Sequence, residues 1–409
     1  MKLVRGLLSL GVGLALSGAL VAQDIAVRAQ RLHTVSGAVI ENGVVLVRSG
    51  KISAVGRASE VQIPSGMRTL AAAVVTPGLI DAHSVVGLAG YLNQPQDQDQ
   101  HDPAAPIQPE LRAIDAYNAR ERLIEWLRGF GVTTIHTGHG PLALISGQTL
   151  IAKTRGDTVD ESVFVPCAMI AATLGADSRA EGPGKSPGTA GKQVALLREA
   201  FLAAREHQRK LREAGDDAAK KPERNLRHEA LIDVLERRVP LLVTAQRHQD
   251  ISSALRLARE FDFALVLDGA SEAYVVLDEI KAAGVSVIAH PPMARFGGEL
   301  ENASRATPKK LADAGLRFAF QSGYESYVPK TRVVLYEAAI AAANGLGADA
   351  ALRAITLDAA RILGVDARIG SLEVGKDGDL ALYDGDPFEY TTHCTATVIE
   401  GVLVSEGAR

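Results

Sequence analysis

The sequence predicts an α/β protein, built as a (β/α)8 TIM-like barrel with a smaller all-β part. Strand-like and helix-like segments alternate through the middle of the chain, which is typical of a parallel sheet and approaches the count of a closed barrel. Short apolar runs with Gly turns lie near both ends, which indicates antiparallel strands. Residues 74–87 (VVTPGLIDAHSVVG) deliver Asp81 and His83 directly after a buried strand, and barrel enzymes keep their reactive groups at such strand ends.

Residues 1–22 have the layout of a secretory signal peptide. Lys2 and Arg5 precede an uncharged apolar run over residues 6–21, and the small residue Ala22 offers a cleavage point. A transmembrane anchor is the alternative, but the run is shorter than the roughly 20 apolar residues that a spanning helix needs. We therefore expect an exported protein, in the periplasm of a diderm bacterium, without a membrane anchor.

The composition limits the classes of partner. Of the 409 residues, 47% are hydrophobic and the formal net charge is −4, which suits one large domain with a smaller one. Only 4% are aromatic and no basic stripe is interleaved with rings, so no nucleic-acid partner is expected. Cys167 and Cys394 are the only cysteines. Their isolation favours buried thiols, although an exported protein could pair them.

The predicted elements follow the chain in order. Short strands bounded by turn residues are expected at 26–32, 43–48 and 52–55, and again at 370–375, 379–384 and 397–404. Between them, a helix is expected at 116–129 and strands at 132–135 and 163–172. The alternation then continues with strands at 240–245, 264–267, 285–289 and 318–321 and helices at 250–260, 273–283, 333–343 and 348–363.

A polar insertion interrupts the alternation at residues 176–228. Gly, Pro and Ser are frequent at 177–191, which indicates a surface loop, and 193–214 has the spacing of a charged amphipathic helix. Two interpretations are open. The insertion is either a solvated element packed on the barrel wall, which the usual behaviour of charged helix faces favours, or an arm that binds a partner.

Three stretches resemble the amidohydrolase superfamily. Residues 74–87 match its first-strand motif PG-[LF]-[IV]-D-x-H-x-H, and residues 351–387 are similar to its carboxyl-terminal signature. Residues 240–274 align without a gap with the imidazolonepropionase-like branch, PVxxHAHRADDIxxALRLAxEFxLxLVLEHGxEAY. The resemblance implies a barrel over 74–368, a composite β-sandwich built from 23–73 and 369–409, and hydrolysis of non-peptide C–N bonds, as in cyclic amides or imides.

Most metal-ligand positions of that family are substituted here. The resemblance implies five ligands besides a bridging Lys or Glu: two histidines of the first strand, one histidine from each of two later strands, and an aspartate of the last strand. Only His83 keeps its type. The second histidine of the first strand is missing, because the chain reads His83-Ser84-Val85; no lysine between residues 133 and 240 plainly serves as the bridge. The histidines of HAH fall on Thr244 and Gln246, that of EHG falls on Gly269 beside Asp268, and the catalytic aspartate falls on Gly323.

This pattern predicts a degenerate metal site, since zinc sites use at least three protein ligands. Hydrolysis would then be lost or weak and no catalytic residue is assigned with certainty. The barrel would bind a small-molecule ligand, or a partner such as a second copy of the chain or a paralogous amidohydrolase. Groups predicted at the barrel mouth could line a pocket for a zwitterion or a peptide-like molecule, or form a salt-linked rim: Gln246, Arg247, Asp268, Gln321 and Tyr324.

A relocated metal site is the alternative. His136, His139 and His290 are each predicted at the carboxyl end of a strand, and with His83 they could hold zinc or another divalent metal whose bound hydroxide attacks the substrate. The competing interpretation is that these histidines are hydrogen-bonded residues of the barrel mouth, and isolated histidines favour it.

Overall fold

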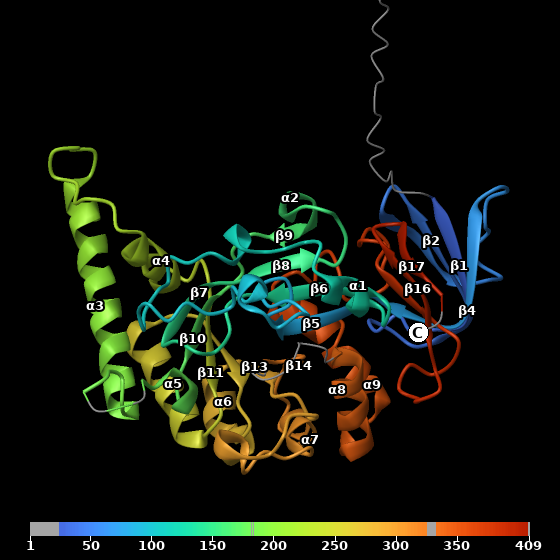
Figure 1. The fold of residues 1–409 in the computed structure, drawn as a ribbon. Coiled ribbons are helices and arrows are strands. Elements are labelled where there is room, and N and C mark those ends of the chain that lie inside the picture. Colours follow the sequence, from blue (N-terminus) through green and yellow to red (C-terminus); the bar gives the residue numbers. More distant parts are fainter. Residues whose placement is uncertain (1–23, 181, 183, 325–332, 408–409) are drawn as a thin grey trace, which may run out of the picture.

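A computed structural model describes residues 24–180, 182, 184–324 and 333–407 of the chain (Figure 1). The predicted signal peptide at 1–22 lies outside the described residues. Within the described ranges, no helix combines the length and the apolar character that crossing a membrane requires.

Strands from both ends of the chain share one seven-stranded sheet, in the order β17-β16-β15-β4-β1-β2-β3. These strands are β1 (Ile25–Leu32), β2 (Ile40–Arg48), β3 (Lys51–Arg57), β4 (Arg68–Pro77), β15 (Leu380–Tyr383), β16 (Cys394–Ile399) and β17 (Val402–Glu406). β4 joins the two sets, because it pairs in parallel with β1 and antiparallel with β15. The strand expected at 370–375 is not present: Gly370 and Gly375 both have φ +92°, so the segment turns.

The site is positioned by a second group of strands that forms two sheets. The first sheet contains β5 (Leu79–Ser84), β6 (Val132–Thr137), β8 (Leu150–Lys153) and β9 (Val163–Val165). The second contains β7 (Ile145–Gln148), β10 (Ile170–Thr173), β11 (Leu241–Ala245), β12 (Leu265–Gly269), β13 (Ser286–Ala289) and β14 (Phe318–Phe320). From β10 to β14 each strand is parallel to its neighbour, so their carboxyl ends meet at one edge.

The ring of eight parallel strands that the sequence predicts is only partly present. β7 and β8 are separated by Thr149 alone and pair antiparallel with β10 and β6, so residues 145–153 bridge the two sheets. On the opposite side, the amide of Gly323 donates to the carbonyl of His83 at 3.4 Å. No ladder joins β14 to β5 in the part of the chain that the structure describes, although the two strands lie side by side, and the described residues form a mixed α/β fold.

Several helices are shorter or more interrupted than expected, and one expected strand is divided. They are α1 (Arg122–Arg128), α2 (Val159–Ser162), α3 (Ala190–Ala214), α4 (Leu226–Leu235), α5 (His248–Phe261), α6 (Leu277–Ala283), α7 (Thr307–Asp313), α8 (Val334–Ala341), α9 (Ala348–Ala354) and α10 (Leu357–Ile362). The helix expected from 116 begins at Arg122, because the Glu121 side chain caps it by accepting from the amide of Leu123. The strand expected at 163–172 divides into β9 and β10, and Pro166 between them has no N–H for a ladder.

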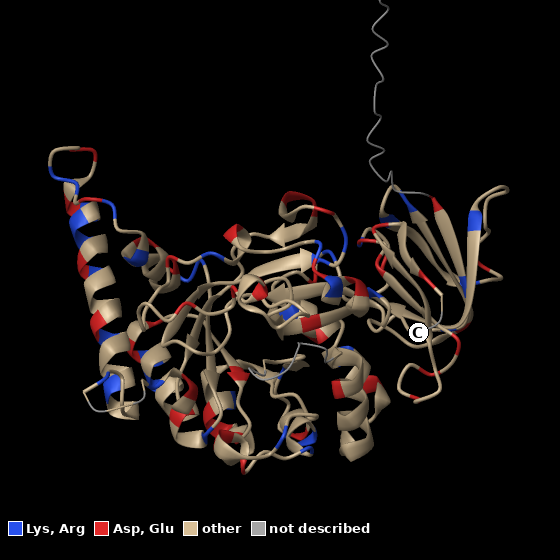
Figure 2. Cartoon of the chain, in the orientation of Figure 1, with Lys and Arg blue, Asp and Glu red and all other residues tan. Residues whose placement is uncertain are grey.

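The insertion forms the long helix α3, at the far side of the molecule from the seven-stranded sheet (Figure 1). Its inner face is anchored by the buried Phe201, whose ring lies 5.2 Å from those of both Phe261 and Phe263. Charged residues of both signs follow one another along α3 (Figure 2). The predicted amphipathic helix is therefore confirmed, and it packs on α4 and α5.

Candidate functional site

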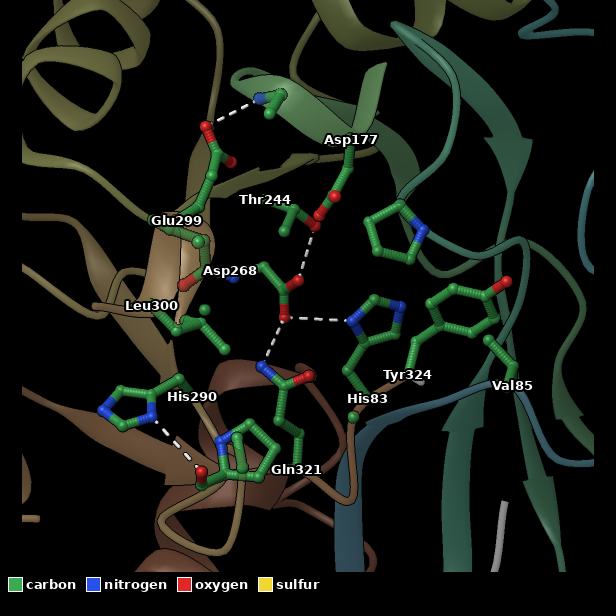
Figure 3. Close-up of a pocket in the computed structure, with 18 of the residues that line it drawn as sticks. His83, Val85, Asp177, Thr244, Asp268, His290, Glu299, Leu300, Gln321 and Tyr324 are labelled. Atoms are coloured by element: carbon green, nitrogen blue, oxygen red, sulfur yellow. Dashed lines mark hydrogen bonds and ion pairs between the residues drawn. The ribbon is translucent and has the colours of Figure 1, made fainter. Parts of the chain in front are cut away.

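The carboxyl ends of β5, β11 and β14 bring three side chains around the carboxylate of Asp268, which lies at the carboxyl end of β12 (Figure 3). Asp268 accepts hydrogen bonds at Oδ1 from His83 Nδ1 at 2.9 Å and from Gln321 Nε2 at 2.8 Å. Its Oδ2 accepts from the hydroxyl of Thr244 at 2.6 Å. We call these four residues the Asp268 cluster. They border a cavity of about 390 Å³, which is within the range of small-molecule sites.

The charges of this cluster stabilise one another. Asp268 and His83 are 2% and 4% exposed. Burial by itself would raise the pKa of Asp268, but the charge and hydrogen bond of His83, with the bonds from Thr244 and Gln321, bring it below the ordinary value. Burial likewise opposes the charged form of His83, and Asp268 outweighs it, so the pKa of His83 is raised.

Two side-chain atoms of β5 are buried without a hydrogen-bond partner among the described residues. One is His83 Nε2. The other is Asp81 Oδ2, although Asp81 Oδ1 accepts from the amides of Ser322 at 3.0 Å and His83 at 3.3 Å. Burial raises the pKa of Asp81 to about 6. Through its hydrogen bond with the amide of Ser322, Asp81 connects the end of β5 to the residues that follow β14.

His136 lies behind His83, with ring centroids 5.7 Å apart, and both of its ring nitrogens are occupied. Nδ1 is 2.7 Å from the carbonyl of Ala82, and Nε2 is 2.6 Å from the hydroxyl of Thr149. Burial lowers the pKa of His136 to about 3, with a contribution from the charge of His83. The ring is therefore neutral, donating to Ala82 and accepting from Thr149.

The other two candidate histidines are placed differently. His290, at the end of β13, lines the same cavity, and its Nδ1 is 3.2 Å from the carbonyl of Pro291. His139 is buried but does not line this cavity. Burial lowers the pKa of each to about 4. Within the described ranges, no three or more His, Cys, Asp or Glu side chains are grouped so that they could hold a metal ion.

At two positions where the resemblance implies metal ligands, a side chain would contact residues that are now present. A Cβ on Gly269 would lie 2.4 Å from Gln246 Nε2, and a Cβ on Gly323 would lie 2.7 Å from Pro291 Cγ. Both glycines also have positive φ, +72° and +74°, which strains any other residue. A histidine at position 269 would therefore displace the flexible end of Gln246, an aspartate at position 323 would press on the Pro291 ring, and both would strain the backbone.

Four of the five residues predicted to form a ligand pocket line this cavity: Gln246, Asp268, Gln321 and Tyr324. Arg247 does not line it, because its guanidinium pairs with Glu301 at 2.9 Å. Val85, at the position of the family's second histidine, is part of the lining.

Sequence reasoning missed two acidic residues of this cavity, Asp177 and Glu299, which lie in the 3-10 turns η3 (Ala176–Ser178) and η5 (Gly298–Leu300). Glu299 accepts from the amide of Ala176 at 2.7 Å, which joins the two turns. Burial raises the pKa of both carboxyls. The only sequence signal near these two residues is the Gly residues beside each turn. Such residues occur in any surface loop, so they do not indicate a binding site.

Comparisons with known proteins agree on one family. A family model described as "Amidohydrolase family" matches residues 309–405. The imidazolonepropionase of Sphingopyxis alaskensis is 24% identical over 416 residues, which cover 88% of this chain and 91% of that protein. The structure of an amidohydrolase from Thermotoga maritima is 26% identical with a TM-score of 0.86, covering 93% and 100% of the two chains. An adenosine deaminase from Xanthomonas campestris, solved with bound zinc, shares the fold at 18% identity and a TM-score of 0.55, covering 93% and 92%.

Proposed function

Because this chain belongs to the amidohydrolase superfamily, we propose that it keeps a ligand-binding pocket of that superfamily while its hydrolysis of non-peptide C–N bonds is lost or weak. The pocket is the cavity beside the Asp268 cluster. The proposal includes the superfamily's barrel, in a variant form in which the antiparallel segment 145–153 takes one place in the ring of strands.

The observation that carries the proposal is the complete hydrogen bonding of Asp268. A metal that a hydrolase uses needs at least three protein ligands and an open position for water. Here the carboxylate is instead satisfied by three protein donors, from His83, Thr244 and Gln321. One ring nitrogen of His83, Nδ1, is engaged in the hydrogen bond to Asp268 and is not available to a metal. The described residues therefore do not fit a metal at the inherited position, and we derive no catalytic step through one.

The closed space at Gly269 and Gly323 supports the same proposal. The resemblance implies a histidine and an aspartate at these positions, and a Cβ at either would collide with Gln246 or Pro291. Restoring these two ligands would therefore require Gln246 and Pro291 to move and would strain the backbone at both positions.

A second candidate is an active hydrolase with a relocated metal on His83, His136, His139 and His290. The observation that favours it is that His83 and His290 line one cavity. It requires His136 to give up its bonds to Ala82 and Thr149, and His139 to turn toward the cavity.

Metal stoichiometry separates the two candidates. The purified chain is exposed to zinc, freed of unbound ions, and assayed for moles of zinc per mole of chain, with His83→Ala and His290→Ala as matched variants. We expect a value near zero for all three proteins. A value near one that both substitutions abolish would establish the relocated site and refute the degenerate one.

A further inference from the structure

We propose that the cavity beside the Asp268 cluster takes a small organic cation that also carries an amide, with the cationic end held by Asp177 and Glu299. This inference rests on the proposed ligand-binding function and adds the chemical class of the ligand.

The charges that line the cavity are acidic. Asp177, Asp268 and Glu299 are among its lining residues, and none of the described residues that line it is Lys or Arg. Asp268 already has three donors and does not need a counter-charge from a ligand. Asp177 and Glu299 remain. A cation placed between them would make the charge-assisted hydrogen bonds that are the strong ones in proteins.

Nearby basic groups do not fill this role. Arg247 points to Glu301 and to the carbonyl of Gly298. The positive charge of Arg179 lowers the pKa of Glu299, but Arg179 does not line the cavity. Glu299 itself spends one carboxylate oxygen, Oε1, on the amide of Ala176, which fixes the carboxylate in place.

An independent observation places a second polar group in the same cavity. His83 lines it, is 4% exposed, and has Nε2 without a partner among the described residues. Figure 3 shows Nε2 on the side of the ring opposite to Asp268, toward Tyr324. An unpaired buried nitrogen is costly unless a ligand completes it. An amide suits Nε2 in either protonation state of the ring, because its carbonyl accepts and its N–H donates.

The size of the cavity agrees with such a ligand. About 390 Å³ is near the lower end of the range for small-molecule sites, so the occupant is a small molecule and not a polymer segment. A short amide with a terminal ammonium group would place one polar group at His83 and the other at the pair of turns that carry Asp177 and Glu299.

Three probes of one scaffold test the inference: N-acetylcadaverine, its uncharged isostere N-hexylacetamide, and the anionic N-acetyl-ε-aminocaproate. Each is titrated into the purified chain by calorimetry at neutral pH and low salt, with EDTA present throughout. We expect N-acetylcadaverine to bind at least about tenfold more tightly than N-hexylacetamide, and the anion to bind most weakly.

Substitutions then locate the preference. The double variant Asp177→Asn, Glu299→Gln should lose it, whereas Glu260→Gln, which changes a carboxylate paired with Arg198 away from the cavity, should keep it. Asp177→Asn alone, at an exposed position, should reduce the preference if the double variant does not fold.

Failure of this inference is distinct from failure of the proposed function. Equal affinities, preference for the anion, absence of binding by N-acetylcadaverine, or a preference that survives both substitutions would each overturn the cation inference. None of these outcomes would show that the chain binds a metal, so the proposed degenerate metal site would stand. Conversely, one zinc per chain would refute the degenerate site, while the titrations in EDTA would still decide the charge preference.

Discussion

Two buried clusters of charged side chains in the described part of the molecule differ in whether every buried polar atom has a hydrogen-bond partner. Between the seven-stranded sheet and β8, Lys153 donates to Asp379 and to Asp377 Oδ2, the latter at 3.2 Å, and lies 4.9 Å from the ring centroid of Phe164. Asp377 also accepts from Lys51 and Arg368, and the other oxygen of Asp379 accepts from a backbone amide. We call this the Lys153 cluster.

In the Asp268 cluster, the Asp268 carboxylate is hydrogen-bonded as completely as the carboxylates of the Lys153 cluster, but atoms around it are not. His83 Nε2 and the neighbouring Asp81 Oδ2 have no partner among the described residues, and His83 lines a cavity. Folding alone favours complete pairing, because an unpaired buried group costs free energy. The difference teaches that the Lys153 cluster holds two layers of the fold together, whereas the Asp268 cluster leaves polar atoms unpaired, as expected of the ligand site that we propose.

The largest effect is expected in the Lys153 cluster. Lys153→Met removes the cation that Asp377 and Asp379 share and leaves buried carboxylates without it, so the free energy of unfolding should fall by about 3–5 kcal/mol. Urea denaturation followed by circular dichroism measures it. The double variant Lys153→Met, Asp379→Leu should recover part of the loss. A loss below about 1 kcal/mol would mean that water replaces the amine, and would remove the contrast between the clusters.

A pH series sharpens the comparison at Asp81. Burial raises its pKa to about 6 from an ordinary value of 3.8, so the folded chain holds a proton that the unfolded chain has already released. Stability should therefore be lost as the pH rises from about 4 to about 6, by at most about 3 kcal/mol. Asp377 should show the opposite slope at lower pH: burial would raise its pKa, but Lys153 and its other partners lower it.

The measurement for Asp81 is the free energy of unfolding in urea between pH 4 and pH 7, taken for the wild type and for Asp81→Asn. The difference between the two proteins should vary across the window, because asparagine does not titrate. A constant difference would contradict a protonated Asp81 in the folded chain.

The smallest effect is expected where the cavity admits water. Thr244→Val keeps the shape of the side chain but removes the donor to Asp268 Oδ2. A water molecule from the adjoining cavity can replace the hydroxyl, so the loss of stability should be only about 1 kcal/mol, in contrast to Lys153→Met. Thr244→Ser, which keeps the hydroxyl, is the matched control. A loss as large as that of Lys153→Met would show that water does not reach the cluster.

The sequence predicts the parallel strands well, but it predicts the surroundings of the Asp268 cluster only in part. Strands β11 and β12 were predicted because each is an apolar run followed by a helix, and Asp268 was predicted at a strand end for the same reason. The antiparallel segment 145–153 was not predicted. Its residue Thr149 engages His136, so a histidine expected at the barrel mouth is instead bonded on both ring nitrogens.

Side-chain direction and contacts between distant loops could not be predicted. Arg247 follows the end of β11, as expected of a residue lining the pocket, yet it pairs with Glu301 from a loop far along the chain. Glu299 reaches the amide of Ala176 across 123 residues of sequence. A single sequence records neither contact, because each depends on how two surface loops fold against one another.

The seven-stranded sheet makes the order of synthesis matter. β4 leaves the ribosome early, but the partner for one of its edges, β15, begins at Leu380. Until then β4 exposes unpaired N–H and C=O groups, and an open strand edge is a template for aggregation. Contacts between such distant residues also form slowly, because a long loop must close first. The nascent chain is therefore most vulnerable while the segment between β4 and β15 is being made, and the last strands to emerge are those that end this exposure.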